Sequence, residues 1–170
     1  MKLKEYILKN ECLEIHVCNL GGIIKNLFVR DCKWKQTDVV LGFDTVEQYA
    51  EPAYLNNYPY FGALIGRYGN RIKDAAFEIN GQTFSLDKND NGNCLHSGSA
   101  GFDKRIWDVE QPDDEHLLLR LTDQDGEGGF PGTLDVTVRY SIEQNVFRVI
   151  HEATCDKATH VNLTQHPYFN

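Results

Sequence analysis

Apolar and polar residues alternate along much of this chain. Residues 13–17 read Leu-Glu-Ile-His-Val, and residues 134–142 keep the same alternation over a longer stretch. A period of two places the apolar side chains on one face of a half-buried strand. Residues 117–121, Leu-Leu-Leu-Arg-Leu, form a continuous apolar run after an acidic turn, which is typical of a buried strand. The pattern therefore predicts β-strands in all three stretches.

Two hairpins are predicted by the residues between such runs. In residues 77–84, Asn80 and Gly81 separate two alternating segments, and Asn-Gly is the strongest short-range signal for a hairpin. Residues 146–154 follow the long run at 134–142 after a polar turn, so they suit its antiparallel partner. The chain is expected to be all-β and mainly antiparallel.

Helical signals are scarce. Residues 45–48, Thr-Val-Glu-Gln, resemble the start of a helix, but Pro52 limits it to about two turns. The Gly-rich residues 126–132 lack the Lys-Ser/Thr ending of a phosphate loop and predict a wide loop between strands. With no repeat or linker, residues 1–170 form one region of a single domain.

Composition excludes several classes of protein. A net charge of −8 with scattered Lys and Arg argues against nucleic acid as a partner. No segment approaches the roughly 18 to 20 apolar residues of a membrane span, and the N-terminus has no apolar signal-peptide core. The five cysteines are irregularly spaced without a Cys-x-x-Cys pair, which favours free thiols in a reducing cytoplasm over zinc or redox motifs.

Two of the six histidines stand out, because His96 and His166 each follow a strand-like run among small or polar neighbours. No pair of histidines has the spacing of a helical metal site, so no metal is expected. Spacing alone still favours structural roles for both. The remaining four are interpreted as structural, solvated or, for the last, ambiguous: His16, His116, His151 and His160.

Four segments together resemble the aldose 1-epimerase (galactose mutarotase) family. They are residues 66–72 (Gly-Arg-Tyr-Gly-Asn-Arg-Ile), 95–107 (beginning Leu-His-Ser-Gly), 126–134 (beginning Gly-Glu-Gly-Gly-Phe-Pro-Gly) and 162–170 (Asn-Leu-Thr-Gln-His-Pro-Tyr-Phe-Asn). Their order and rough spacing hold across the whole chain. Two departures are Ser97, where the family usually has Gly, and Gln165, where it often has Asn. Neither change removes a catalytic group.

The resemblance implies a large antiparallel β-sandwich and an enzyme that interconverts the α and β anomers of free aldohexoses, such as galactose and glucose. The implied enzyme needs no cofactor. His166 is the implied general acid, and His96 is the second catalytic residue, binding and orienting the sugar near its ring oxygen. A histidine suits this chemistry because its ordinary pKa lies near neutrality.

The resemblance also implies substrate-binding residues. Asn70 and Arg71 offer several directed hydrogen bonds to sugar hydroxyls. Tyr168 presents an aromatic ring to the apolar C–H surface of the sugar, whereas Phe169 is interpreted as packing beneath the site. We expect Asn70, Arg71, His96 and His166 to converge on one concave surface.

The resemblance covers only the N-terminal half of the family. The family's general base, a glutamate, and a substrate-binding aspartate lie in the other half. We therefore expect a truncated sandwich that is a poor catalyst alone. Residues 161–170 are expected to form a final strand whose uncovered edge favours self-association.

Two other readings stay open. A hexose-phosphate 1-epimerase would need additional Arg or Lys for the phosphate. A non-catalytic carbohydrate-binding β-sandwich would keep Asn70, Arg71 and His96 for recognition alone. In each reading the partner is a small-molecule sugar.

Overall fold

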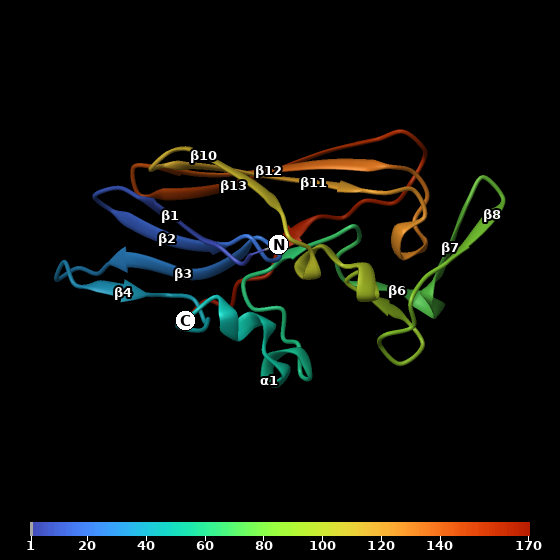
Figure 1. Cartoon of the computed structure of the whole chain (residues 1–170), viewed down its shortest axis with the longest axis horizontal. Helices are drawn as coiled ribbons and strands as arrows, with labels where there is room; N and C mark the ends of the chain where they lie inside the picture. Colours follow the sequence, from blue (N-terminus) through green and yellow to red (C-terminus); the bar gives the residue numbers. More distant parts are fainter. Residues whose placement is uncertain (1) are drawn as a thin grey trace.

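The computed structural model describes residues 2–170 and contains two four-stranded antiparallel sheets, each with its strands in sequence order (Figure 1). The strands of the first sheet are β1 (Glu5–Lys9), β2 (Leu13–Cys18), β3 (Ile23–Arg30) and β4 (Gln36–Asp38). Those of the second are β10 (Asp108–Asp113), β11 (His116–Asp123), β12 (Leu134–Glu143) and β13 (Val146–Cys155).

The alternating residues meet between the two sheets. Ile15 and Val17 of β2 and Val136 and Val138 of β12 are buried in one shared core. The polar residues between them point away from this core, as the period of a strand requires. The predicted all-β antiparallel sandwich is therefore confirmed.

Both predicted hairpins are confirmed. The short strands β7 (Ala76–Ile79) and β8 (Gln82–Ser85) meet at Asn80 and Gly81, whose φ angles of 52° and 79° suit the tight turn that Asn-Gly favours. β12 and β13 pair along their whole length around the turn at Gln144.

Helices are short, as expected. Gln48 Oε1 accepts the Thr45 backbone N–H at 3.0 Å, but the 3-10 helix Glu47–Ala50 follows Val46 without a side-chain cap, so the helix start expected at Thr45–Gln48 is only partly formed. Pro52 is the first residue of α1 (Pro52–Leu55), a position where its missing N–H costs nothing. No helix within residues 2–170 has the length and apolar character needed to cross a membrane. The 3-10 helices are Glu47–Ala50, Lys73–Ala75, Gly98–Ala100, Phe102–Lys104 and Glu127–Gly129.

The expected final strand over residues 161–170 is wrong. Only β14 (Thr164–Gln165) forms there, paired with β5 (Leu64–Ile65), and isolated bridges join Asn162 to Tyr68 and Phe169 to Val40. Pro167 interrupts the segment because it has no N–H to donate to a neighbouring strand. Phe169 is 67% exposed, so its expected packing beneath the site is also wrong.

Candidate functional site

One pocket is lined by all five site residues that were predicted from the sequence. Asn70, Arg71, His96, His166 and Tyr168 line a cavity of about 650 Å³. They come from three segments that lie far apart in the sequence. The expected convergence on one concave surface is observed, and the chemical role of each residue stays a prediction.

Two pairs of short strands bring these segments together. β6 (Arg71–Ile72) pairs with β9 (Cys94–Leu95), which sets Arg71 opposite Leu95 and beside His96. β14 pairs with β5, and His166 follows β14 directly. Each of the two pocket histidines is thus the first residue after a two-residue strand.

His96 is held as a neutral imidazole. Its Nδ1 accepts a hydrogen bond from the backbone N–H of Asn70 at 2.9 Å, which places the ring proton on Nε2. Burial lowers the pKa of His96 to about 4, helped by the positive charges of His166, Lys104 and Arg71. The Nε2–H has no hydrogen-bond partner within residues 2–170 and is available to a sugar oxygen.

This pKa predicts how acid acts on the folded chain. The unfolded chain takes up a proton on His96 near pH 6.5, whereas the folded chain resists it down to about pH 4. Between these values the unfolded state binds more protons, so the free energy of unfolding should fall as the pH drops. NMR titration of the His96 ring should show a midpoint near 4, and His96→Gln should weaken this acid sensitivity relative to His160→Gln. A midpoint near 6.5 would contradict the prediction.

His166 is fixed through its backbone rather than its ring. Its N–H donates to Ala63 O at 2.9 Å, and its carbonyl accepts the N–H of Gly62 at 3.0 Å. The ring centroid lies 5.5 Å from that of His96, with the two planes at 86°. Neither ring nitrogen of His166 has a hydrogen-bond partner within residues 2–170, so both are open to a ligand.

Gln165 secures the segment that carries His166. Its Oε1 accepts a hydrogen bond from the Tyr140 hydroxyl at 2.8 Å, and its Nε2 donates to the carbonyl of Gly22 at 3.2 Å. Tyr140 lies on β12 and is 1% exposed, which anchors the pocket to the core of the sandwich. An amide at this position is therefore structural here, and the longer Gln fills the role.

The predicted sugar-binding residues are also oriented by neighbours. Arg71 Nε donates to Asp90 Oδ2 at 2.6 Å, which leaves the two terminal NH2 groups of the guanidinium for a ligand. The Tyr168 hydroxyl donates to Pro59 O at 2.9 Å, so the ring rather than the hydroxyl borders the cavity. The ring centroids of Tyr168 and His166 lie 5.2 Å apart.

Three supporting residues were missed at the sequence level. Tyr60 lines the pocket with its ring centroid 4.8 Å from that of His96 and 5.9 Å from that of His166. Asn162 Nδ2 donates to Gly69 O at 2.9 Å, and Ser97 Oγ accepts the Tyr68 N–H at 2.8 Å. The aromatic run at residues 58–61 was the available signal for Tyr60, whereas the hydroxyl contact of Ser97 had none.

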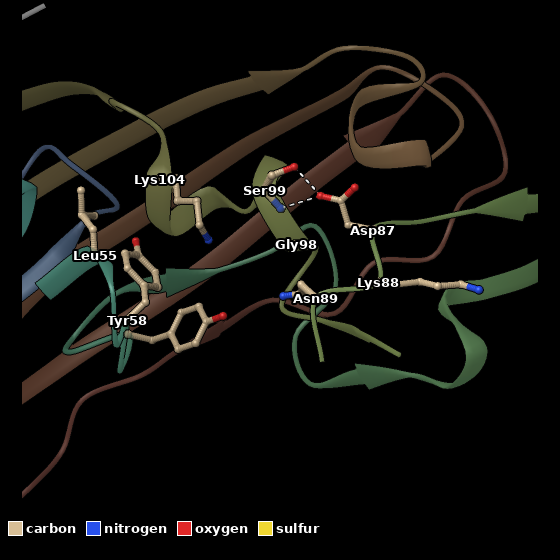
Figure 2. A pocket seen from close by; sticks show the side chains of 9 residues that line it. Leu55, Tyr58, Asp87, Lys88, Asn89, Gly98, Ser99 and Lys104 are labelled. Atoms are coloured by element: carbon tan, nitrogen blue, oxygen red, sulfur yellow. Dashed lines mark hydrogen bonds between the residues drawn. The ribbon is translucent and has the colours of Figure 1, made fainter. Parts of the chain in front are cut away.

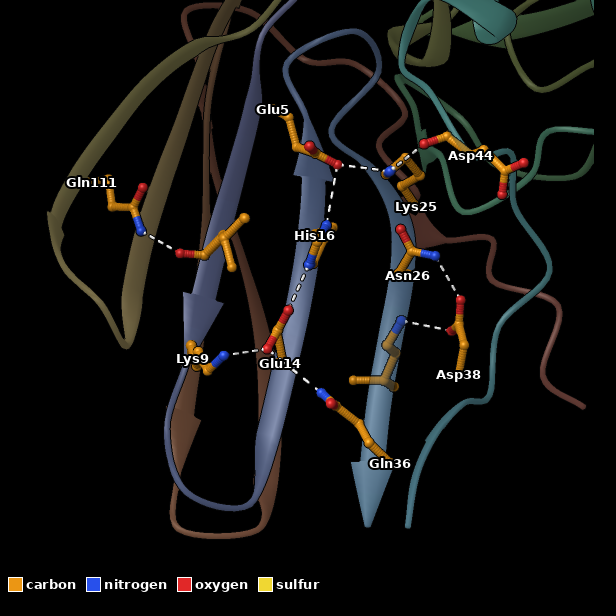
Figure 3. Close-up of polar contacts among 12 residues, drawn as sticks. Glu5, Lys9, Glu14, His16, Lys25, Asn26, Gln36, Asp38, Asp44 and Gln111 are labelled. Carbon is orange, nitrogen blue, oxygen red and sulfur yellow. Dashed lines mark hydrogen bonds and ion pairs between the residues drawn. The ribbon is translucent and has the colours of Figure 1, made fainter.

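The other histidines lie outside the pocket. Figure 3 shows His16 between two carboxylates, with Nδ1 3.2 Å from Glu5 Oε1 and Nε2 2.9 Å from Glu14 Oε1. His116 contacts Asp113, in accord with its expected place in an acidic turn. Within residues 2–170, no group of three or more His, Cys, Asp and Glu residues is arranged to hold a metal ion.

Comparison with known proteins agrees with this geometry. A family profile described as aldose 1-epimerase matches residues 4–170. The chain belongs to the aldose 1-epimerase family. It is 38% identical to galactose mutarotase of Homo sapiens over 168 residues, which is 99% of this chain and 47% of the relative. It is 40% identical to aldose 1-epimerase of Haemophilus influenzae over 132 residues, which is 75% of this chain and 38% of the relative.

Solved structures of this epimerase family share the fold. An aldose epimerase homologue from C. elegans matches with a TM-score of 0.91 at 27% identity, over 99% of this chain and 51% of the other. Galactose 1-epimerase from Lactobacillus acidophilus matches with a TM-score of 0.85 at 27% identity, over 100% of this chain and 49% of the other. The mutarotase type of the sandwich is confirmed, and the chain spans about half the length of the curated relatives it matches.

Proposed function

We propose that this chain binds a free aldose and supplies the acid side of an aldose 1-epimerase site. The observation that carries the proposal is the pair of histidine rings, 5.5 Å apart, facing one polar pocket with their outer nitrogens unoccupied by protein groups. The similarity to galactose mutarotase and aldose 1-epimerase supports it. Free galactose or glucose is the substrate we propose, and the cytoplasm, where five free thiols are stable, is the compartment.

The chemistry follows from the two rings. His166 donates a proton to the ring oxygen of the sugar as the bond between that oxygen and the anomeric carbon breaks. The anomeric hydroxyl loses its proton to a base, which leaves the open-chain aldehyde. Rotation about the bond between C1 and C2 turns the aldehyde, and reclosure with the protons returned gives the other anomer. Throughout these reaction steps the Nε2–H of His96 orients the sugar, while Asn70 and Arg71 bind its hydroxyls.

The base is the component that the described pocket does not contain. Within residues 2–170, no aspartate or glutamate lines the cavity. The relatives are about twice as long as this chain, which covers 47% of the human one. We propose that the base belongs to polypeptide corresponding to the rest of the relatives' length, and that residues 1–170 are one part of a sandwich that this polypeptide completes.

The test measures anomer exchange of galactose and glucose by polarimetry and by NMR. The chain alone should show saturable binding of the sugar with exchange close to the uncatalysed rate, because a proton acceptor is missing. Addition of the remaining half of human galactose mutarotase should raise the rate. Full activity of the chain alone would contradict the missing base. Binding without exchange in both samples would favour a non-catalytic sugar-binding module, and preference for glucose 6-phosphate would favour the phosphate variant.

Self-association is proposed through a different edge from the one the sequence indicated. β13 lies at the edge of its sheet, and Val146 and Ile150 on it are 48% and 43% exposed. A long uncovered edge with apolar side chains favours pairing with another chain. Size-exclusion chromatography of the same sample should show dimers or larger species, and Ile150→Lys should shift them toward the monomer. A monomer at every concentration would overturn this part.

A further inference from the structure

Tyr60 joins the two pocket histidines to the aromatic side chains beside them. Its ring centroid lies 4.8 Å from that of His96, with the planes at 71°, and 5.9 Å from that of His166, with the planes at 39°. The ring of Tyr58, which lines a neighbouring cavity rather than the sugar pocket, meets Tyr60 edge to face with centroids 4.9 Å apart. Both histidine rings therefore share Tyr60 as an aromatic neighbour.

His166 depends on such neighbours for its orientation. Neither of its ring nitrogens has a hydrogen-bond partner within residues 2–170, so only packing limits rotation about its side-chain bonds. The aromatic rings that pack against it are those of Tyr60, Tyr168 and His96. A proton donor works only within hydrogen-bond reach of the atom that it protonates, so the packing around this ring bears on the rate.

The backbone of Tyr60 is held in a conformation that a tyrosine rarely adopts. Its φ angle is 61°, in the left-handed region, where a bulky side chain is strained. The carbonyl of Tyr60 accepts the N–H of Ala63 at 3.2 Å, and the carbonyl of Ala63 accepts the N–H of His166 at 2.9 Å. The turn that directs Tyr60 is thus bonded to the segment that carries His166. Strained positions of this kind cluster at functional sites, where the surrounding structure fixes them.

A lysine packs against the same tyrosines from the neighbouring cavity. Lys104 Nζ lies 5.4 Å from the centre of the Tyr60 ring and 4.5 Å from the centre of the Tyr58 ring, both within the range of cation–π contacts. Figure 2 shows Lys104 beside Tyr58 in the lining of this cavity. Lys104 lines this cavity and not the sugar pocket, so its contact with the histidines runs through the ring of Tyr60.

The lysine is itself fixed in place. Its Nζ lies 2.6 Å from Oδ2 of Asp103, a fully buried carboxylate. The hydroxyl of Tyr58 donates to the backbone carbonyl of the same Asp103 at 3.2 Å. The lysine and the tyrosine that contact Tyr60 are therefore both anchored at one buried residue, which makes the packing on this side of Tyr60 rigid.

Tyr60 offers its ring to the site rather than a proton. Burial raises the pKa of its hydroxyl to about 12, and the charges of Asp103 and Asp90 act in the same direction. The hydroxyl therefore stays protonated near neutral pH, where the two histidines are proposed to act. The contribution of Tyr60 is then the shape and the edge of an aromatic ring.

We propose that Tyr60 is a positioning residue of the epimerase site, which holds the imidazoles of His96 and His166 in place, and that Lys104 fixes Tyr60. This inference rests on the proposed function, since it takes both imidazoles to face the sugar. The ring of Tyr60 keeps His166 aimed at the ring oxygen of the sugar and keeps the Nε2–H of His96 directed into the pocket. Without that ring either imidazole can turn, which slows proton transfer more than it weakens sugar binding.

The experiment compares Tyr60→Leu with Tyr60→Phe in a fusion of this chain with the remaining half of human galactose mutarotase. Leucine lacks an aromatic edge, so kcat for anomer exchange of galactose should fall about tenfold while KM changes less than about threefold. Phenylalanine keeps the ring and should hold kcat within about twofold of the parent. Lys104→Met should lower kcat in the same direction by a smaller factor, and an unchanged kcat there would remove Lys104 from the proposal.

NMR of the 170-residue chain gives a second readout that does not depend on catalysis. The ring centroids of His96 and His166 lie 5.5 Å apart, so their protons should show a nuclear Overhauser contact. Tyr60→Leu should abolish this contact, and Tyr60→Phe should retain it. Persistence of the contact in Tyr60→Leu would overturn the positioning role, whether or not the fusion is active.

Phe84→Leu is the matched control. Phe84 is also half-buried and stacks on another ring, that of Phe77, with centroids 5.3 Å apart. It lies on β8, outside the sugar pocket, and its variant should keep the parent kcat and the contact between the histidine rings. Equal losses in Tyr60→Leu and Phe84→Leu, or in Tyr60→Leu and Tyr60→Phe, would overturn the role of the Tyr60 ring. A parent fusion without anomer exchange would contradict the proposed function, and the NMR contact would then decide the positioning role alone.

Discussion

Replacing His166 by asparagine should lower the rate of catalysed anomer exchange by about 10² to 10⁴, the usual contribution of a positioned general acid. Asparagine keeps a polar, hydrogen-bonding side chain, but its amide cannot act as a general acid. The backbone bonds of His166 to Ala63 and Gly62 do not depend on the ring, so the pocket should persist. The measurement is kcat by polarimetry in a fusion of this chain with the remaining half of human galactose mutarotase, together with sugar affinity.

His160→Asn is the matched control. It makes the same substitution six positions earlier, at an exposed ring that packs against Phe77 with centroids 4.9 Å apart and lies outside the pocket. Its kcat should stay near that of the parent fusion. Unchanged turnover in His166→Asn would remove this residue from the mechanism, and an equal loss in both variants would indicate a general effect on the fold.

Replacing Arg67 by methionine should lower the free energy of unfolding by about 3 to 5 kcal/mol, because the buried Asp123 carboxylate then keeps only the less buried Arg105, 3.2 Å from its Oδ1. The Arg67 side chain is 1% exposed and that of Asp123 is 3% exposed. The Nε and one terminal nitrogen of Arg67 each lie 2.8 Å from Asp123 Oδ2, and the other terminal nitrogen donates to Pro131 O at 2.9 Å. Urea unfolding followed by circular dichroism gives the change.

The control is an arginine in an exposed ion pair. Arg120 lies 2.8 Å from Glu110, with side chains 46% and 58% exposed, so Arg120→Met should cost at most about 1 kcal/mol. The double variant Arg67→Met with Asp123→Leu should recover part of the loss, because it removes both buried charges. Equal losses for Arg67→Met and Arg120→Met would show that the buried pair has no special weight.

The strands predicted correctly from the sequence are those that pair with a neighbouring strand close in the sequence. The turn at Asn80 and Gly81 and the long pairing of β12 with β13 each depend on residues that are close in sequence, so alternation and turn residues were sufficient. The segment at 161–170 contacts residues 63–69 and Val40 instead. No period within the segment encodes these distant partners, which is why it was expected to be one long strand.

The site shows the same limit at the level of side chains. The motif at residues 66–71 contains two arginines, and the sequence does not distinguish the buried ion-pair residue Arg67 from the pocket residue Arg71 without the family resemblance. Tyr60 contacts both histidine rings only because β5 and β14 bring residues 60–66 against 164–168. The sequence predicted which chemical groups line the pocket, but it did not predict which residues hold those groups in place.

The pocket is held by the smallest elements of the fold. Strands β5, β6, β9 and β14 have two residues each, and isolated bridges at Tyr68 and Val40 complete the framework. Such elements open locally at a lower free energy than the ten-residue strands β12 and β13. A sugar that contacts Arg71, His96 and His166 together would bind only the closed state of these strands. Binding would therefore lower the population of locally opened states by mass action. The bound sugar would then contribute to the folding stability of the region that recognises it.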